Sequence, residues 1–293
     1  MDLIRTLLFI PGNNPKMLAK GPSLPVDVLV PDLEDSVPPD EKPAARGVVA
    51  EHLPGLAGYR VFVRVNGMQT EWTWGDLQAV VSDHIEGISI GKMESAEMAK
   101  ELSALLSALE AERGLPDGHT KIIPWIETAK GVANAMEIAL ATPRMFGLAF
   151  GAEDYTADMG ITRTQESEEI AAPRALVAIA ARAADIIAFD TPDPDYTDIE
   201  NLYKECRRAK AVGYKGKFII HPNQVGPTNE VFGPAPEEID HARRVVKAFE
   251  EATARGTAAV ALDGKMVDTP VWKRAVKVLE VAAAMEKLEA ASR

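Results

Sequence analysis

One pattern constrains the fold of this chain more than any other. A short apolar run, a polar cluster and a stretch of helical periodicity follow one another eight times along the sequence. The eight predicted strands span residues 7–10, 26–30, 60–65, 87–90, 121–126, 145–150, 186–189 and 217–220. Eight strands, each followed by a helix or a helix-sized connection, predict a closed parallel (β/α)8 barrel of the TIM type.

Helices are predicted between these strands, at residues 40–52, 96–113, 131–141, 168–184 and 198–212. Ser95 and Thr197 precede two of them as expected N-terminal caps, and Gly213 follows the last one as an expected stop. The main alternative is an open doubly wound sheet. The first turn, Pro-Gly-Asn-Asn-Pro-Lys, lacks the three-glycine dinucleotide fingerprint, which disfavours that alternative.

The barrel is expected to occupy residues 1–256, and residues 257–293 form an extension that a barrel does not need. A helix in this extension is predicted to begin at Val271, with Trp272, Val276, Leu279 and Ala283 on one face. The predicted fold is therefore α/β, a (β/α)8 barrel with a C-terminal helical extension. The extension either caps its own barrel or packs on a neighbouring subunit.

Composition and charge disfavour several kinds of partner. The chain has 32 basic and 44 acidic residues, a net charge of −12 and no dense basic run, which argues against a nucleic-acid partner. The first apolar run is soon interrupted by Pro-Gly, and no stretch reaches the ~20 apolar residues of a membrane span. The single cysteine, Cys206, excludes a disulfide within the chain and favours the cytoplasm. It lies in a predicted helix and is expected to pack there rather than act as a nucleophile.

Charged residues follow most of the predicted strands at the point where each strand ends. In a barrel, the carboxyl ends of all strands open onto one mouth, where barrel enzymes have their active sites. The side chains expected to converge there are Asp32, Glu34, Asp35, Arg64, Lys92, Glu94, Glu127, Glu153, Asp154, Asp190 and His221. Strand ends also prefer polar residues simply because they meet solvent. Solvent exposure does not readily explain so many acids beside a single strand-end arginine.

A cluster of carboxylates with few histidines favours a hard cation. Mg²⁺ prefers oxygen ligands and usually takes one or two protein carboxylates, with water and substrate in its other positions. Glu127 and Asp154 are the best pair, because each ends one of two neighbouring strands. Asp32, Glu34 and Asp35 are better placed to hold waters around the metal. Zinc is disfavoured because no His/Cys spacing typical of zinc sites is present.

Three further features could contact a substrate. Arg64 alternates with valines and is expected to face the mouth, where it either pairs with acids or contacts a substrate oxyanion. His221, kept extended by the following proline, could be a base, a donor to a carbonyl or a structural residue. The first turn, with Lys16 and Lys20, offers a weak phosphate grip.

Several long motifs occur in a characteristic order. They are LLFIPGN, PDLEDSVPPDEKPAAR, VRVNG, IETAKG, GLAFGAEDYTADMG, HPNQVGPTNEVF and DGKMVDTP. Together they resemble the citrate lyase beta subunit-like family of the HpcH/HpaI aldolase superfamily, which includes malyl-CoA and citramalyl-CoA lyases. The resemblance extends from Arg5 to about Lys277, and it is specific for the family but not for the substrate.

The resemblance implies a homotrimeric barrel that binds Mg²⁺ or Mn²⁺ through Glu127 and Asp154. It implies that Arg64 contacts the substrate and its oxyanion, together with the metal ligand Glu127. Asp268 matches a carboxylate that the adjacent subunit supplies as the general acid/base.

Coenzyme A is expected as part of the substrate, and Phe9, Asn14 and Lys20 match positions that contact it in the family. We add His221 to these candidate coenzyme A contacts. Relatives usually have arginine at position 14, so Asn14 brings the phosphate grip into question, although Lys16 is close enough to substitute.

The implied function is Mg²⁺-dependent cleavage or formation of a 3-hydroxyacyl-CoA thioester of the malyl, citramalyl or citryl type. The products of cleavage are acetyl-CoA and an oxo acid. One alternative is the beta subunit of a citrate lyase complex, which acts on a thioester held by an acyl-carrier protein. Asn14 favours it, because such a substrate lacks the adenosine 3′-phosphate. A second alternative is thioester hydrolysis on the same scaffold, and a non-catalytic binding barrel is poorly supported.

Overall fold

The computed structural model describes residues 3–291, with side chains through residue 286. The chain divides into two compact units: Ile4–Thr228, and the segment from Asn229 onward. We had expected the barrel to extend to residue 256. The helix over Pro236–Ala254 packs on the last helix of the chain, so it belongs to the second unit.

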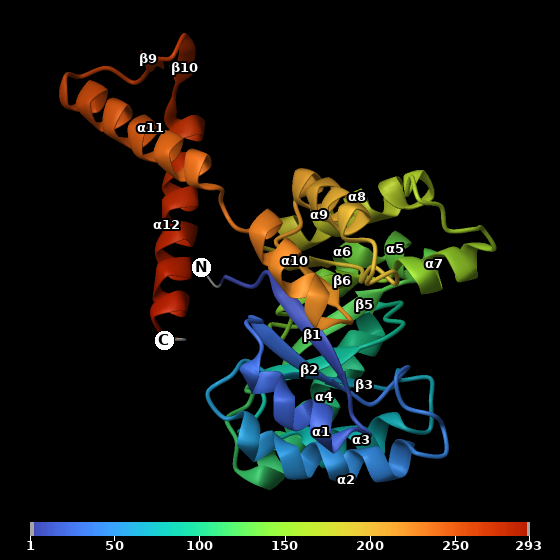
Figure 1. Cartoon of the computed structure of the whole chain (residues 1–293). Coiled ribbons are helices and arrows are strands. Elements are labelled where there is room, and N and C mark those ends of the chain that lie inside the picture. The colour runs from blue at the N-terminus through green and yellow to red at the C-terminus, as the bar shows by residue number, and fades with distance from the viewer. Residues whose placement is uncertain (1–2, 292–293) are drawn as a thin grey trace. The chain divides into compact units, whose positions relative to one another are not determined.

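Eight parallel strands close into a barrel in chain order (Figure 1). They are β1 (Thr6–Pro11), β2 (Val28–Asp32), β3 (Phe62–Val65), β4 (Gly87–Ile90), β5 (Lys121–Ile126), β6 (Gly147–Phe150), β7 (Ile187–Asp190) and β8 (Gly216–Ile219). The pairing of β8 with β1, including Leu7 opposite Phe218, closes the ring. The predicted (β/α)8 fold and all eight predicted strands are confirmed.

Helices and short 3₁₀ turns connect the strands. The helices are α1 (Pro15–Lys20), α2 (Lys42–His52), α3 (Thr73–Val80), α4 (Ala96–Arg113), α5 (Ala129–Ala133), α6 (Ala135–Ala139), α7 (Ala152–Met159), α8 (Ala171–Ala183), α9 (Ile199–Val212) and α10 (Val225–Phe232). The 3₁₀ turns are η1 (Gly21–Ser23), η2 (Leu53–Leu56), η3 (Glu168–Ile170) and η4 (Pro222–Gln224). The helix predicted over 131–141 is two short helices, because Asn134 leaves helical geometry with φ −102° and ψ 8°.

The predicted helix ends are mostly confirmed. The Ser95 hydroxyl caps α4 by accepting from the Met98 N–H, and Gly213, with φ 119°, ends α9. The predicted cap at Thr197 is wrong. Asp198 caps α9 instead, because its carboxylate accepts from the Asn201 N–H at 2.9 Å.

Aromatic side chains fill the barrel, since every second strand residue points inward. The inward-facing aromatic residues are Phe9, Phe62, Trp125, Phe189 and Phe218. The ring centroids of Phe9, Trp125 and Phe218 lie 4.5 to 5.8 Å from one another. This stack forms the floor beneath the mouth of the barrel.

The C-terminal unit has its own small core. It consists of α11 (Pro236–Ala254), the hairpin strands β9 (Val260–Leu262) and β10 (Lys265–Val267), and α12 (Thr269–Ala291). Asp263 and Gly264 form the hairpin turn with φ of 51° and 74°, as an Asp-Gly pair favours. Among the side chains of α12 through residue 286, Ala275 and Ala282 are buried, whereas Ala283, which was predicted to share a face with Trp272, Val276 and Leu279, is exposed.

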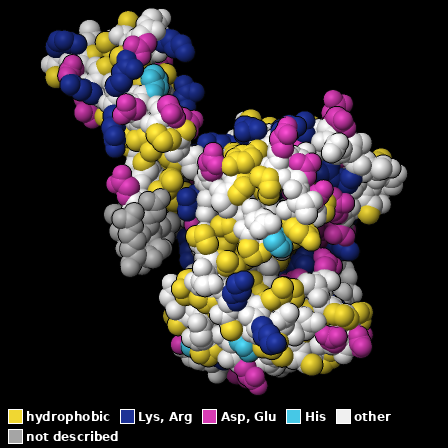
Figure 2. Space-filling view, viewed as in Figure 1, with side chains coloured by type: hydrophobic (Ala, Val, Ile, Leu, Met, Phe, Trp, Pro, Cys, Tyr) yellow, Lys and Arg dark blue, Asp and Glu magenta, His cyan; other side chains and the backbone are white. Residues whose placement is uncertain are grey.

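Within residues 3–291, no helix is both long and apolar enough to cross a bilayer. On the face drawn in Figure 2, basic and acidic side chains are interspersed.

Candidate active site

An ion pair between Arg64 on β3 and Asp32 on β2 lies at the mouth of the barrel. The two residues pair directly in the sheet. The guanidinium Nε lies 2.7 Å from one Asp32 oxygen, and Nη2 lies 2.6 Å from the other. The guanidinium carbon is 4.2 Å from the centre of the Phe9 ring. This two-point geometry fixes both the position and the plane of the guanidinium.

The two members of this pair stabilise each other's charged form. Burial of Asp32 works against its ionised form, but the Arg64 charge and hydrogen bonds hold its pKa below the usual value. Burial likewise works against the Arg64 charge, but Asp32 and the neighbouring acids raise its pKa above the usual value. Arg64 therefore pairs with acids, which was one of the two roles expected for it.

Two more acids reach Arg64 from the loop after β2. Nη1 of Arg64 lies 3.2 Å from Glu34 Oε2 and 2.9 Å from Asp35 Oδ2. The Glu34 N–H donates to Asp32, which folds the loop back on itself. Lys42 is buried, and its Nζ donates to the Glu34 carbonyl at 2.6 Å. Arg64 thus fixes the carboxylates of this loop, while Asp32 and Lys42 fix its backbone at Glu34.

Glu127 follows β5 directly and is 7% exposed. Its Oε1 accepts from the Lys92 N–H at 2.7 Å, and Lys92 has a left-handed backbone with φ 51°. A Cβ on Gly151 would lie 2.3 Å from Glu127 Oε2. A Cβ on Gly91 would lie 2.8 Å from Glu34 Oε1 and 3.0 Å from Glu127 Oε1. Positions 91 and 151 require glycine, because the carboxylates of Glu34 and Glu127 occupy the space that a Cβ would fill.

Asp154 lies in the first turn of α7 and faces the same group of residues. Its Oδ1 lies 3.2 Å from Nζ of Lys92. Burial raises the pKa of Glu127 to about 8, and the charges of Asp154 and Glu34 act in the same direction. Burial also raises the pKa of Glu34 to about 7, against the lowering effect of Arg64. A cation among these carboxylates would offset both burial and mutual repulsion.

The donor set fits Mg²⁺. Among the residues that can be described, no three His, Cys, Asp or Glu side chains form a complete metal centre. Mg²⁺ does not need one, because it takes one or two carboxylates and keeps several waters. Glu127 and Asp154 could provide the direct oxygen ligands, and Glu34 and Asp35 could hold waters.

Three other acids predicted at the mouth have different partners. Glu94 pairs with Lys130 at 3.4 Å, and Glu153 pairs with Arg163 at 3.1 Å. The prediction for Asp190 is wrong. Phe189 faces the barrel core, so the next residue points outward, where Asp190 is fully buried.

The candidate coenzyme A contacts each have a defined local role. Phe9 forms the floor under Arg64 and is 8% exposed. Asn14 caps α1, because its Oδ1 accepts from the Met17 N–H at 3.1 Å, which arginine could not do. Lys20 is exposed at the end of the same helix. His221 stacks on Tyr196 with centroids 4.4 Å apart, and its Nδ1 accepts from the Asn223 N–H.

Asp268 lies in the C-terminal unit, between β10 and α12. It is half-buried, and its Oδ1 accepts from the Val271 N–H at 3.1 Å, so it caps α12. This cap is a local structural reason for an acid at this position. The second carboxylate oxygen of Asp268 has no part in this bond.

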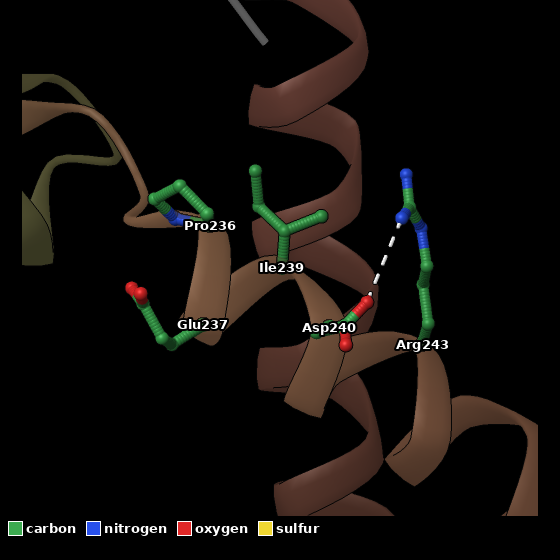
Figure 3. Close-up of a pocket in the computed structure, with 5 residues that line it drawn as sticks. All are labelled: Pro236, Glu237, Ile239, Asp240 and Arg243. Carbon is green, nitrogen blue, oxygen red and sulfur yellow. Dashed lines mark ion pairs between the residues drawn. The ribbon is translucent and has the colours of Figure 1, made fainter.

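A surface hollow also occurs in the C-terminal unit (Figure 3). One helix, α11, provides its lining, which consists of Pro236, Glu237, Ile239, Asp240 and Arg243. Asp240 and Arg243 form an ion pair at 3.8 Å across one turn. All the side chains that line the hollow come from one helix, whereas side chains from several strands converge at the mouth of the barrel. The mouth is therefore the better candidate site.

Sequence reasoning missed the residues that support this site. Gly91 and Gly151 had a recognisable signal, since each directly follows a strand and a charged residue comes within the next two positions. Lys42 had none, because its motif has the form of an ordinary helix start.

The chain is similar to known proteins over most of its length. The family model described as HpcH/HpaI aldolase/citrate lyase matches residues 5–222. The chain is 40% identical over 282 residues to the citrate lyase subunit beta of Leuconostoc mesenteroides subsp. cremoris, covering 96% of this chain and 93% of the relative. It is 36% identical over 266 residues to the (3S)-malyl-CoA thioesterase of Cereibacter sphaeroides, covering 90% and 89%. The crystal structure of CitE from Mycobacterium tuberculosis with magnesium, acetoacetate and coenzyme A matches with a TM-score of 0.79, 31% identity and coverage of 96% and 98%.

Proposed function

The chain belongs to the HpcH/HpaI aldolase/citrate lyase family, and we propose that it is a Mg²⁺-dependent carbon–carbon lyase for a 3-hydroxyacyl-CoA thioester. The reaction breaks the bond between the hydroxyl-bearing carbon and the carbon next to the thioester. It gives acetyl-CoA and an oxo acid, or runs in reverse. The observation that carries the proposal is the convergence of Glu34, Glu127 and Asp154 beside Arg64. The CitE complex with magnesium, acetoacetate and coenzyme A supports it.

Glu127 and Asp154 are the proposed metal ligands, with Glu34 and Asp35 holding waters. When bound, Mg²⁺ would supply Lewis-acid polarisation of substrate oxygens. Arg64 already neutralises Asp32, so Mg²⁺ would supply the further positive charge with which Glu34, Glu127 and Asp154 can be ionised together.

Arg64 is the proposed contact for substrate oxygen that gains negative charge. Its plane is set by Asp32 and by the Phe9 ring, so little reorganisation is needed when charge develops. Its raised pKa keeps the guanidinium charged throughout the reaction.

Asp268 is the proposed acid/base. In cleavage, the hydroxyl proton passes to solvent as the oxo group forms and the carbon–carbon bond breaks, and protonated Asp268 gives its proton to the enolate carbon of the acetyl unit and regains one from solvent. In condensation, Asp268 removes that proton. We propose that a neighbouring subunit of a homotrimer supplies Asp268, and that Phe9, Asn14, Lys20 and His221 contact coenzyme A.

Two alternatives have support from relatives. The 40% identity to a citrate lyase subunit beta supports action within a complex, on a thioester held by an acyl-carrier protein. The use of Asn14 as a helix cap, which leaves position 14 without a cation for a phosphate, favours the same alternative. The 36% identity to a (3S)-malyl-CoA thioesterase supports hydrolysis on the same scaffold.

One experiment separates these outcomes. The protein and Mg²⁺ are incubated with malyl-, methylmalyl-, citramalyl- and citryl-CoA, and with one such acyl group on an acyl-carrier protein. Mass spectrometry then identifies the products. A CoA lyase gives an oxo acid and acetyl-CoA, or propionyl-CoA from methylmalyl-CoA, whereas a thioesterase gives free coenzyme A and a hydroxy acid. Turnover of the carrier-bound thioester alone would favour the complex, and no turnover of any substrate would contradict the proposal.

A further inference from the structure

Helix α7 carries Asp154 in its first turn but has no cap of its own. The first N–H groups of a helix have no partner within it, and a side chain just before the helix normally accepts from them. Gly151 occupies that position and has no side chain. No residue with a side chain fits there, because a Cβ would lie 2.6 Å from Cβ of Glu127. The close approach of Glu127 therefore prevents α7 from having an ordinary cap.

Thr191 provides the missing acceptor from the adjacent strand. It follows β7 directly and is 3% exposed. Its Oγ1 accepts from the N–H of Ala152, the first residue of α7, at 3.1 Å. Asp154 is two residues further along the same turn. A single hydroxyl thus connects the end of β7 to the turn that orients Asp154.

Thr191 is itself held by a buried group of charged residues. Its carbonyl accepts from Nζ of Lys217, which is 1% exposed and also lies 2.7 Å from Asp190 Oδ2. The other Asp190 oxygen lies 3.0 Å from Nε of Arg174, an ion pair without hydrogen-bond geometry. Arg174 in turn pairs with Glu205 at 2.7 Å. Buried charges that are paired in this way resist displacement, since separating them leaves an uncompensated charge.

We propose that Thr191 is a positioning residue that sets the distance between Asp154 and Glu127 for the divalent cation. This inference rests on the proposed metal site. Glu127 is fixed by β5 and by the Lys92 N–H, whereas Asp154 depends on where α7 begins. Without the Thr191 hydroxyl, the first turn of α7 loosens and Asp154 no longer keeps its place relative to Glu127.

The test measures Mg²⁺ affinity by isothermal titration calorimetry, without substrate. Thr191→Val keeps the shape of the side chain but removes the hydroxyl, and should weaken Mg²⁺ binding roughly fivefold, the factor of a lost helix cap. Thr191→Ala removes the same acceptor without a new methyl group and provides a second measurement if the valine variant does not fold. Thr191→Ser keeps the hydroxyl and should restore parental affinity.

Thr6→Val is the matched control. Thr6 is fully buried, and its Oγ1 accepts from the Asp27 N–H at the same distance, 3.1 Å, but at the opposite end of the barrel. Thr6→Val should lower the thermal midpoint as Thr191→Val does, but it should leave Mg²⁺ affinity unchanged. Equal weakening in Thr6→Val, or unchanged affinity in Thr191→Val and Thr191→Ala, would overturn the inference. Glu127→Gln separates the two proposals: if it binds Mg²⁺ as the parent does, the metal site itself is misplaced.

Discussion

Arg64 and Asp32 form a two-point ion pair across the adjacent strands β3 and β2, with nitrogen–oxygen distances of 2.7 and 2.6 Å. Asp32 is fully buried, so the guanidinium of Arg64 pairs with a carboxylate whose charge solvent cannot screen. Lysine has a single charged nitrogen and cannot reproduce both contacts. Replacing Arg64 by lysine therefore tests whether activity depends on the oriented guanidinium or only on its charge.

The first prediction concerns Arg64→Lys. We expect kcat to fall about 100-fold or more with the fold retained, because the charge stays while the oriented donors are lost. Steady-state kinetics and circular dichroism measure the two effects. Full activity in Arg64→Lys together with unfolding of Arg64→Ala would instead show that Arg64 serves only as an ion-pair partner.

The second prediction concerns the metal ligands. Glu127→Ala and Asp154→Ala should each weaken Mg²⁺ binding severely, because a site with two carboxylate ligands loses one of them. EDTA should abolish activity, and Mg²⁺ or Mn²⁺ should restore it. Glu153→Ala is the matched control, since Glu153 is adjacent in sequence but pairs with Arg163. Full activity of metal-free protein would contradict the mechanism.

The third prediction is a pH dependence of Mg²⁺ binding. Burial raises the pKa of Glu34 to about 7 and that of Glu127 to about 8, so both carboxyls are largely protonated below pH 7 in the metal-free protein. Mg²⁺ binds the ionised form and must displace these protons. Its affinity should therefore rise as the pH increases through 7 and 8 and level off above. Calorimetry in buffers of different ionisation enthalpy counts the released protons, and a pH-independent affinity would contradict this prediction.

The fold was predictable because its signal is local and repeated. The apolar runs that became β4 and β5 were predicted with their observed ends. The class of enzyme, a citrate lyase type of lyase, is confirmed by the family match and by relatives that span most of the chain. In this chain, the long motifs indicate the family, and the alternation of apolar runs with helical segments predicts the barrel fold.

Side-chain direction was less predictable, and Asp190 shows why. Strands of a parallel sheet are buried on both faces, so the apolar run of β7 does not indicate which residue faces the barrel. The wrong cap at Thr197 has a similar cause. Thr197 and Asp198 are adjacent residues that both occur at helix N-caps, aspartate more often than threonine, and the structure has Asp198 at this position.

Contacts between distant residues could not be inferred from one sequence. The capping of α7 by Thr191 joins two elements 39 residues apart, and no local pattern indicates it. The space that Glu127 takes beside Gly151 is a packing fact of the same kind. The expected contribution of Asp268 to another subunit stays a prediction, because it depends on an arrangement of separate chains.

The last prediction concerns Asp268, which caps α12 and is the proposed acid/base. Asparagine caps a helix as well as aspartate does but cannot transfer a proton at neutral pH. Asp268→Asn should therefore keep the parental thermal midpoint and Mg²⁺ affinity but lose turnover by a factor of about 100 or more. Asp268→Ala loses the cap as well and should also be less stable. Parental turnover in Asp268→Asn would limit the residue to its capping role.

Mixing two variants then tests which subunit supplies Asp268. Asp268→Asn and Arg64→Lys proteins, each with strongly reduced turnover alone, are unfolded and reassembled together. If Asp268 acts on a neighbouring barrel, mixed oligomers contain some sites with a parental Arg64 from one chain and a parental Asp268 from another. Partial activity should therefore return. If each barrel uses its own Asp268, every site in the mixture keeps one defect, and turnover stays at the level of the single variants. Mass spectrometry of the assembled protein shows whether the subunits have exchanged.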